Sequence, residues 1–187
     1  AVNHYKDDKK IFAVSLYSQT WNGYSNRVFY PLRNEYDAFI SQIECSWGEC
    51  FIGERWKEFR EWYQEREDKL AFRTDVPEVV YSWKESRSKY LLYYIVENDL
   101  YYLTPYESFT TNFHKAGTHA QITSSAYQVP LMYGEKEYIF PEFAKAVKYD
   151  AFFESVFLKE KLEKRFPQKR ICVDYFGLHR NYCEYDI

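Results

Sequence analysis

The segment Leu100-Tyr-Tyr-Leu-Thr-Pro-Tyr-Glu-Ser-Phe-Thr-Thr-Asn-Phe-His-Lys-Ala-Gly-Thr-His119 joins an apolar run to a long polar loop. The run Leu100–Leu103 predicts a buried strand, because four consecutive apolar or aromatic residues leave neither face polar. The loop places hydroxyl, amide, imidazole and amino groups after that strand, where a rigid scaffold commonly positions ligand-binding groups. Turn-forming residues of an ordinary surface loop give the same composition. Composition alone therefore leaves both interpretations open.

The last part of this loop contains residues that suit an anionic ligand. Gly117 can adopt a positive φ and let the backbone approach a ligand closely. Lys115, Thr118 and His119 lie beside it in the sequence, and such groups can hold a phosphate, or a metal that carries one.

A helix is predicted immediately before the strand. Ser82 and Glu85 have the spacing of a capping box, in which each side chain bonds the other residue's backbone amide. The helix then runs to about Glu97, and Asn98-Asp99 ends it. Its apolar face is formed by Trp83, Tyr90, Leu91, Tyr94 and Ile95. A helix leading into a buried strand is typical of an α/β layer fold.

Further elements are predicted on both sides of this unit. Lys10–Leu16 is apolar and β-branched, which favours a strand. Arg55–Leu70 has helical spacing of aromatic residues and a charged opposite face. Helical patterns are expected over 141–153 and 158–166, and a late strand over 170–176.

Composition limits the classes of function. The chain has 187 residues, 46% hydrophobic and 28% charged, with a net charge of −3, which fits one globular domain, 1–187. No basic block is present, so we expect no nucleic-acid partner. No apolar run reaches the length of a membrane span. Four cysteines and no signal peptide favour free thiols in the cytoplasm, although their even number also permits disulfides. Aromatic residues make up 21%, which suits either sugar binding or an aromatic core.

Several motifs occur in an order that resembles the second half of bacterial family 2 glycosyltransferases of the GT-A fold. The resemblance covers about residues 5–133. The motifs are Tyr5-Lys-Asp-Asp-Lys-Lys-Ile-Phe-Ala-Val-Ser-Leu-Tyr-Ser18, Ser46-Trp-Gly48 with Trp56, Ser82-Trp83, and Pro105, Ser108 and Asn112 followed by Gly117-Thr-His119. It implies a partial GT-A-like (Rossmann-like) mixed sheet with packed helices, the acceptor-side half only. Residues 150–187 lie outside the resemblance, and the sequence leaves open whether they belong to the same domain or form a C-terminal extension.

The resemblance also implies a reaction. The intact enzyme would bind a nucleotide-sugar donor through an N-terminal half that precedes Ala1, and would hold a divalent metal, Mn²⁺ or Mg²⁺. It would transfer the sugar, with inversion, to a surface-polysaccharide or lipid-linked acceptor. A carboxylate would deprotonate the acceptor hydroxyl. We expect a location in the cytoplasm or at the inner face of the membrane, and no transfer by this half alone.

Roles for individual residues follow from the resemblance. Related enzymes carry an acid just before Ser-Trp, where this chain has Tyr81, so the base is sought among neighbouring carboxylates: Glu49, Asp75, Glu78 and Glu85. The substrate-binding candidates are Trp47, Gly48, Trp83, Ser108 and Asn112. Lys115, Gly117 and Thr118 would bind the diphosphate, and His119 would be a metal or diphosphate ligand.

A second class of function is also compatible with the sequence. The aromatic loops would equally serve a non-catalytic carbohydrate-binding or scaffold domain. Half of a GT-A sheet would in addition leave an apolar edge strand, so we expect this chain to self-associate.

Overall fold

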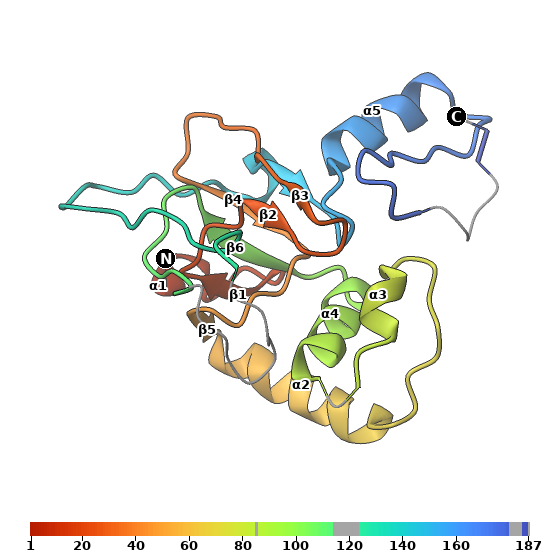
Figure 1. The fold of residues 1–187 in the computed structure, drawn as a ribbon, viewed down its shortest axis with the longest axis horizontal. Coiled ribbons are helices and arrows are strands. Elements are labelled where there is room, and N and C mark those ends of the chain that lie inside the picture. Colours follow the sequence, from red (N-terminus) through yellow and green to blue (C-terminus); the bar gives the residue numbers. More distant parts are fainter. Residues whose placement is uncertain (85, 114–123, 180–184, 187) are drawn as a thin grey trace.

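The computed structural model describes residues 1–84, 86–113, 124–179 and 185–186. Its centre is a five-stranded sheet in the order β5-β1-β6-β4-β7 (Figure 1). Strands β1 and β6 are parallel, as are β4 and β7, whereas β1 with β5 and β4 with β6 are antiparallel. The strands are β1 (Ile11–Ser15), β4 (Ala38–Ser41), β5 (Glu49–Phe51), β6 (Tyr101–Pro105) and β7 (Lys148–Tyr149), with a separate hairpin of β2 (Trp21–Asn22) and β3 (Arg27–Val28).

The helices gather mainly on one side of this sheet. Figure 1 shows α2, α3 and α4 as one group, whereas α5 lies away from them beside the C-terminal segment. Their bounds are α1 (Val2–Tyr5), α2 (Gly53–Arg66), α3 (Glu78–Tyr81), α4 (Arg87–Glu97) and α5 (Val156–Arg165), and a 3₁₀ turn, η1, covers Phe143–Lys145. A mixed sheet with packed helices confirms the α/β class expected from the sequence.

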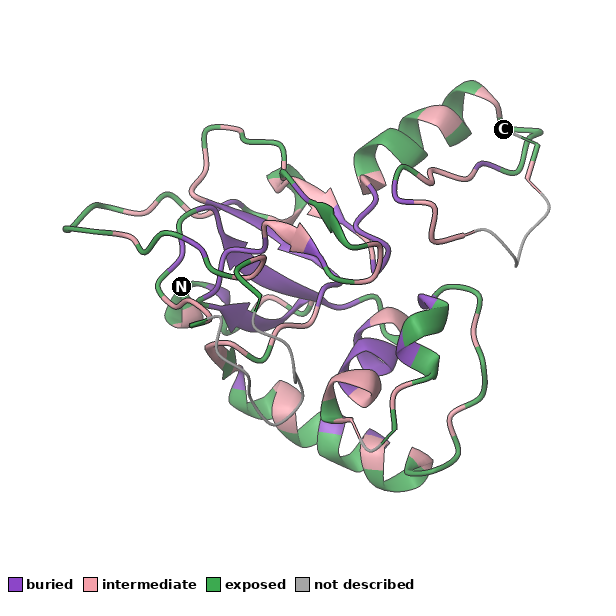
Figure 2. Cartoon of the chain, in the orientation of Figure 1, coloured by how far each residue is buried: buried purple, intermediate pink, exposed green. Residues whose placement is uncertain are grey.

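The core lies on both faces of the three middle strands. Every residue of β1, β4 and β6 is buried (Figure 2). On one face Phe12 contacts rings from four other elements. The ring centroids are 5.5 Å away for Phe51 of β5 and Tyr94 of α4, 5.8 Å for Tyr102 of β6, and 6.2 Å for Phe59 of α2. This cluster ties both long helices to the sheet.

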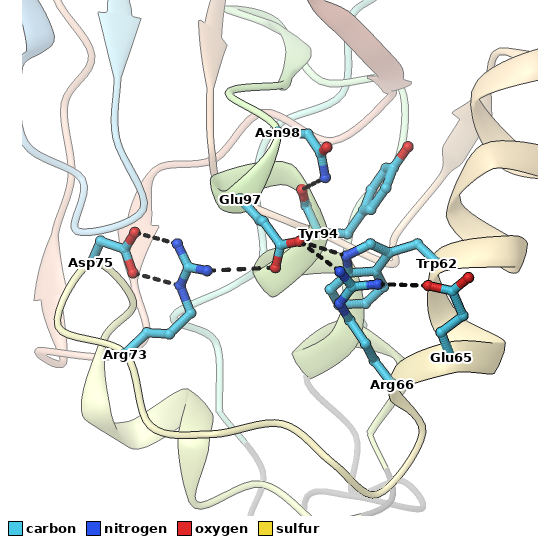
Figure 3. Close-up of polar contacts among 8 residues, drawn as sticks. All are labelled: Trp62, Glu65, Arg66, Arg73, Asp75, Tyr94, Glu97 and Asn98. Atoms are coloured by element: carbon cyan, nitrogen blue, oxygen red, sulfur yellow. Dashed lines mark hydrogen bonds and ion pairs between the residues drawn. The ribbon is translucent and has the colours of Figure 1, made fainter.

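A polar network closes the outer end of the helical group (Figure 3). The Glu97 carboxylate at the end of α4 accepts hydrogen bonds from Trp62 Nε1 at 3.0 Å and from Arg66 of α2 at 3.2 Å. It also pairs at 3.5 Å with Arg73, which binds both oxygens of Asp75. The chain between α2 and α3 is therefore fastened to the end of α4.

Two expected features near α4 differ in the structure. The predicted capping box is wrong, because Ser82 follows α3 and its hydroxyl donates to the Val79 carbonyl at 2.6 Å. Helix α4 begins later, at Arg87, with Ser86 as its N-cap. Glu85 lies outside the described residues.

The C-terminal part also differs from the secondary structure that its sequence pattern predicts. The helix expected over 141–153 is limited to η1 and is followed by β7. Asp150 explains the break, because one carboxylate oxygen accepts the backbone amides of both Phe152 and Glu154 at 2.9 Å, and Phe153 has a φ of +66°. The expected strand over 170–176 is irregular, with a turn at its end. Helix α5 confirms the helix expected over 158–166.

Across the described parts of the chain, no helix has both the length and the apolar character that a membrane crossing requires.

We predict that Phe12→Ala lowers the free energy of unfolding by about 3–5 kcal/mol, because it opens a cavity where the sheet meets α2 and α4. Phe113→Ala is the matched control, since that ring is exposed, and should change the value by less than about 0.5 kcal/mol. Urea denaturation of both variants measures the difference. Equal losses would contradict the central role of Phe12.

Candidate functional site

A pocket of about 460 Å³ lies between α3 and several of the loops that connect the strands. Its walls combine aromatic rings with a carboxyl group, an amide, a hydroxyl and a thiol. The lining residues come from the loop after β1, the turn between β2 and β3, the segment after β4, α3 with the residues after it, and two later loops: Gln19, Gly23, Tyr24, Ile43, Glu44, Cys45, Ser46, Trp47, Val79, Trp83, Tyr127 and Phe153.

The structure brings the two tryptophans among the predicted substrate-binding residues into this one pocket, here called the tryptophan pocket. Trp47 and Trp83 are 36 positions apart in the sequence and both line the cavity. Trp47 packs edge-on against Tyr17 and Tyr127, with ring centroids 4.9 and 5.1 Å away. Trp83 lies 6.0 Å from the Tyr24 ring. The neighbouring rings hold both indoles in place.

The turn that presents Trp47 depends on Gly48. Gly48 has a φ of +89°, and an added Cβ would lie 2.9 Å from the Leu16 Cβ. Its carbonyl accepts the Leu16 amide at 2.8 Å, and the Thr110 hydroxyl donates to the Trp47 carbonyl at 2.9 Å. Gly48 thus allows the turn to pack closely against the end of β1. The structure gives it this backbone role, and it is not among the pocket-lining residues.

Glu44 and Glu49 lie on either side of this turn in the sequence, and their carboxyl groups are in contact with each other. Glu49 accepts a hydrogen bond from the Tyr102 hydroxyl at 3.0 Å and forms a short ion pair with Arg87. Glu44 accepts from the Ser88 hydroxyl at 2.9 Å and shares a hydrogen bond with Glu49. Their side chains are 7% exposed for Glu44 and 4% for Glu49. Glu44 lines the pocket, and Glu49 lies beyond the lining residues.

The pair favours one shared proton. Burial, together with the neighbouring Glu49 carboxylate, raises the pKa of Glu44 to about 7. Burial also raises the pKa of Glu49, but Arg87 and the Tyr102 hydroxyl oppose that shift. Glu49 is therefore the member that keeps the negative charge, and Glu44 the member that carries the proton and donates it toward Glu49. At neutral pH Glu44 can gain or lose a proton readily.

The thiol in the pocket has no comparable reactivity. Burial raises the pKa of Cys45 to about 12, so it is a neutral thiol at physiological pH and a poor nucleophile. Cys45, Cys50 and Cys172 are free thiols in the described structure.

Of the other candidate carboxylates that the structure describes, Asp75 and Glu78 are not among the residues that line this pocket. Glu78 is exposed in the first turn of α3. Glu85 lies outside the described residues, as do Lys115, Gly117, Thr118 and His119. The described ranges contain no group of three or more His, Cys, Asp or Glu side chains that could hold a metal.

Ser108 and Asn112 also lie apart from the tryptophan pocket. The Ser108 hydroxyl accepts the Ser18 amide at 2.9 Å and donates to the Thr110 carbonyl at 2.6 Å. It joins the loops after β1 and β6, and it lines a different hollow of about 600 Å³ beside Arg33 and Lys136. Asn112 is half-buried and lines neither cavity.

Glu44 is the site residue that sequence reasoning missed. Its signal was the spacing of two acids, Glu44 and Glu49, on either side of Ser46-Trp-Gly48. Its significance depends on partners that arrive from α4 and β6, which the local sequence does not show.

Comparison of this chain with protein-family models, with curated proteins and with solved structures gave no match.

We predict that Glu44→Gln reduces the pH dependence of stability. The folded state holds the Glu44 proton more tightly than the unfolded chain does. The resulting stabilisation is fully present below the unfolded pKa and is lost as the pH rises through the folded pKa, between about 4.5 and 7. The melting temperature of the wild type should therefore fall over this range. Glutamine keeps the hydrogen bond without titrating, so the fall should be smaller.

Two further buried acids set the baseline for this measurement. Burial raises the pKa of Asp150 to about 6 and that of Glu154 to about 7, so part of the fall should remain in Glu44→Gln. Glu78→Gln, at an exposed position, is the control and should leave the wild-type curve unchanged. An unaltered slope in Glu44→Gln would contradict the shared proton.

Proposed function

We propose that the tryptophan pocket binds a sugar unit of a glycan acceptor and that Glu44 is the general base that activates its hydroxyl. The chain would then be the acceptor-side part of an inverting glycosyltransferase of the GT-A type. The observation that carries this proposal is a buried carboxyl, paired with a second one, in the wall of a pocket that also contains two indoles, where burial raises the pKa of Glu44 to about 7.

The walls of the pocket suit a sugar. Indole and phenol rings can pack against the apolar faces of a pyranose, and the polar groups at the ring edges can form hydrogen bonds with its hydroxyls. Gln19, Ser46 and Glu44 supply hydrogen-bonding groups among the rings. The volume of about 460 Å³ falls within the range of roughly 300–1,000 Å³ that is usual for small-molecule sites.

The acid pair suits proton abstraction. A base whose pKa lies near the working pH is most effective, because it is partly ionised and still binds the proton firmly. Once ionised, Glu44 would accept the proton of an acceptor hydroxyl as that oxygen attacks the anomeric carbon. Glu49 stays charged beside Arg87 and keeps the pKa of Glu44 high through repulsion.

The donor side of the reaction is not assigned to described residues. In the enzymes that the chain resembles, a divalent metal stabilises the charge of the leaving diphosphate. The residues implied for the diphosphate and the metal are Lys115, Gly117, Thr118 and His119, all outside the described ranges. The steps assigned to Trp47, Trp83 and Glu44 involve no metal.

A non-catalytic glycan-binding domain is the second candidate, supported by the same two indoles. The two functions differ in their need for Glu44. A binding domain requires only hydrogen bonding at this position, which glutamine also provides, whereas a transferase requires a group that accepts a proton.

A glycan array of bacterial capsular and lipopolysaccharide oligosaccharides tests the pocket directly. We predict that the 187-residue chain binds members of the array. Trp83→Ala should lose this binding, since the indole forms one wall. Tyr133→Ala, at an exposed site away from the pocket, should keep it. Loss in neither variant, or no binding by the wild type, would contradict the proposal.

Catalysis is then tested on the bound glycan in a protein that carries this chain together with a nucleotide-sugar site. Glu44→Gln should bind the glycan normally and lower kcat by about 10²–10⁴-fold, the usual contribution of a general base. Glu78→Gln, at an exposed position, should transfer at the wild-type rate. Normal turnover by Glu44→Gln with retained binding would leave the glycan-binding domain as the better assignment.

A further inference from the structure

Helix α5 packs very little against the rest of the described chain. None of the residues of Val156–Arg165 is buried, and Figure 2 shows the helix largely exposed, with half-buried patches, beside the C-terminal segment. A helix of ten residues is marginal in water unless one face packs against a surface. The exposed helix therefore calls for a partner surface.

One face of α5 is both apolar and basic. At 100° per residue, the positions that share this face are Phe157, Leu158, Lys161, Leu162 and Arg165. Phe157 is 59% exposed, and the Lys161 ammonium lies 4.4 Å from the centre of its ring. The two acidic residues, Glu160 and Glu163, lie toward the other side.

Exposed apolar side chains from other segments continue this face. Leu158 lines a hollow of about 340 Å³ together with Val28, Tyr30, Leu32 and Tyr175. Tyr30 is 80% exposed and Tyr175 is 77% exposed. Large apolar groups that gather in this way on a protein surface commonly mark an interaction site.

The charge of this region contrasts with that of the whole chain. Residues 156–170 contain six basic and two acidic side chains, whereas the chain has a net charge of −3. A second copy seated on the same face would bring the basic groups of the two copies together, which is unfavourable. The occupant should instead be apolar in part and anionic.

We propose that this face of α5, with the adjoining hollow, docks on the surface of an anionic membrane. Phe157, Leu158, Tyr30 and Tyr175 would enter the boundary between headgroups and acyl chains, where aromatic side chains are favoured. Lys161 and Arg165 would pair with lipid phosphates. This inference is independent of the function assigned to the tryptophan pocket.

Co-sedimentation of the 187-residue chain with lipid vesicles tests the proposal. We expect binding to vesicles that contain phosphatidylglycerol and little binding to vesicles of phosphatidylcholine alone. Added salt should weaken the binding, because the attraction is partly electrostatic.

Two pairs of variants separate the face from general effects of charge and hydrophobicity. Lys161→Glu with Arg165→Glu should weaken partitioning by roughly tenfold or more, whereas Lys57→Glu with Arg60→Glu on the exposed side of α2 makes the same charge change and should have a much smaller effect. Phe157→Ser should reduce binding, and Ile139→Ser, at another exposed apolar position, should retain it.

Three results would overturn the proposal. The first is equal sedimentation with neutral and anionic vesicles, and the second is an equal loss from the α2 and α5 charge reversals. The third is the absence of vesicle binding. If the chain is then a dimer that Phe157→Ser dissociates, a second copy of the chain covers this face in place of a membrane. Circular dichroism of each variant shows whether the fold is retained.

Discussion

Burial of both faces of the middle strands is the constraint on which the structure depends. Strands β1, β4 and β6 have no exposed residue, so each face needs its own cover. Helices α2 and α4 cover one face through the ring cluster around Phe12. Tyr5 of α1 and the segment around Phe140 and Phe143 cover the other. Loops that leave these strands are consequently held by a rigid support.

The candidate site is a consequence of that arrangement. Packing of α4 on the sheet brings Arg87 and Ser88, at the start of the helix, to the acids on either side of the Trp47 turn. The hydroxyl of Tyr102, from the middle of the sheet, donates a hydrogen bond to Glu49. Glu44 is then in contact with a charged carboxylate in a poorly solvated place, and its raised pKa follows from that contact. The packing of α4 on the sheet therefore both fixes the Trp47 turn and raises the pKa of Glu44.

Patterns in the sequence predicted several of the elements that form the core, but not the buried middle strand β4. Apolar runs predicted β1 and β6, and the 3.6-residue period predicted α2, because burial itself produces those patterns. The helix predicted over 141–153 is wrong, because the Asp150 carboxylate accepts hydrogen bonds from two backbone amides and the chain turns there. The Ser82 capping box failed for a similar reason, because its hydroxyl bonds back to α3.

The site was predictable only in part. The aromatic pair Trp47 and Trp83 came from a family resemblance, and the structure places both in one pocket. Glu44 could not be selected from the sequence, because a carboxyl pKa is set by burial and by partners that are distant in the chain. The resemblance led to four candidate bases, Glu49, Asp75, Glu78 and Glu85. Of these, Glu49 is the partner that tunes Glu44, and Glu78 stays in solvent.

The proposed role of Glu44 depends most directly on the proton that it shares with Glu49. Carbon-13 NMR of side-chain carboxyls, assigned by comparison with Glu44→Gln, measures the titration of Glu44 in the intact 187-residue chain. We predict that the Glu44 carboxyl titrates near pH 7 and that the midpoint falls in Glu49→Gln, where the neighbouring charge is absent. A Glu44 carboxyl that titrates near its ordinary value of 4.5 in both proteins would contradict the shared proton, and with it the role of Glu44 as the base.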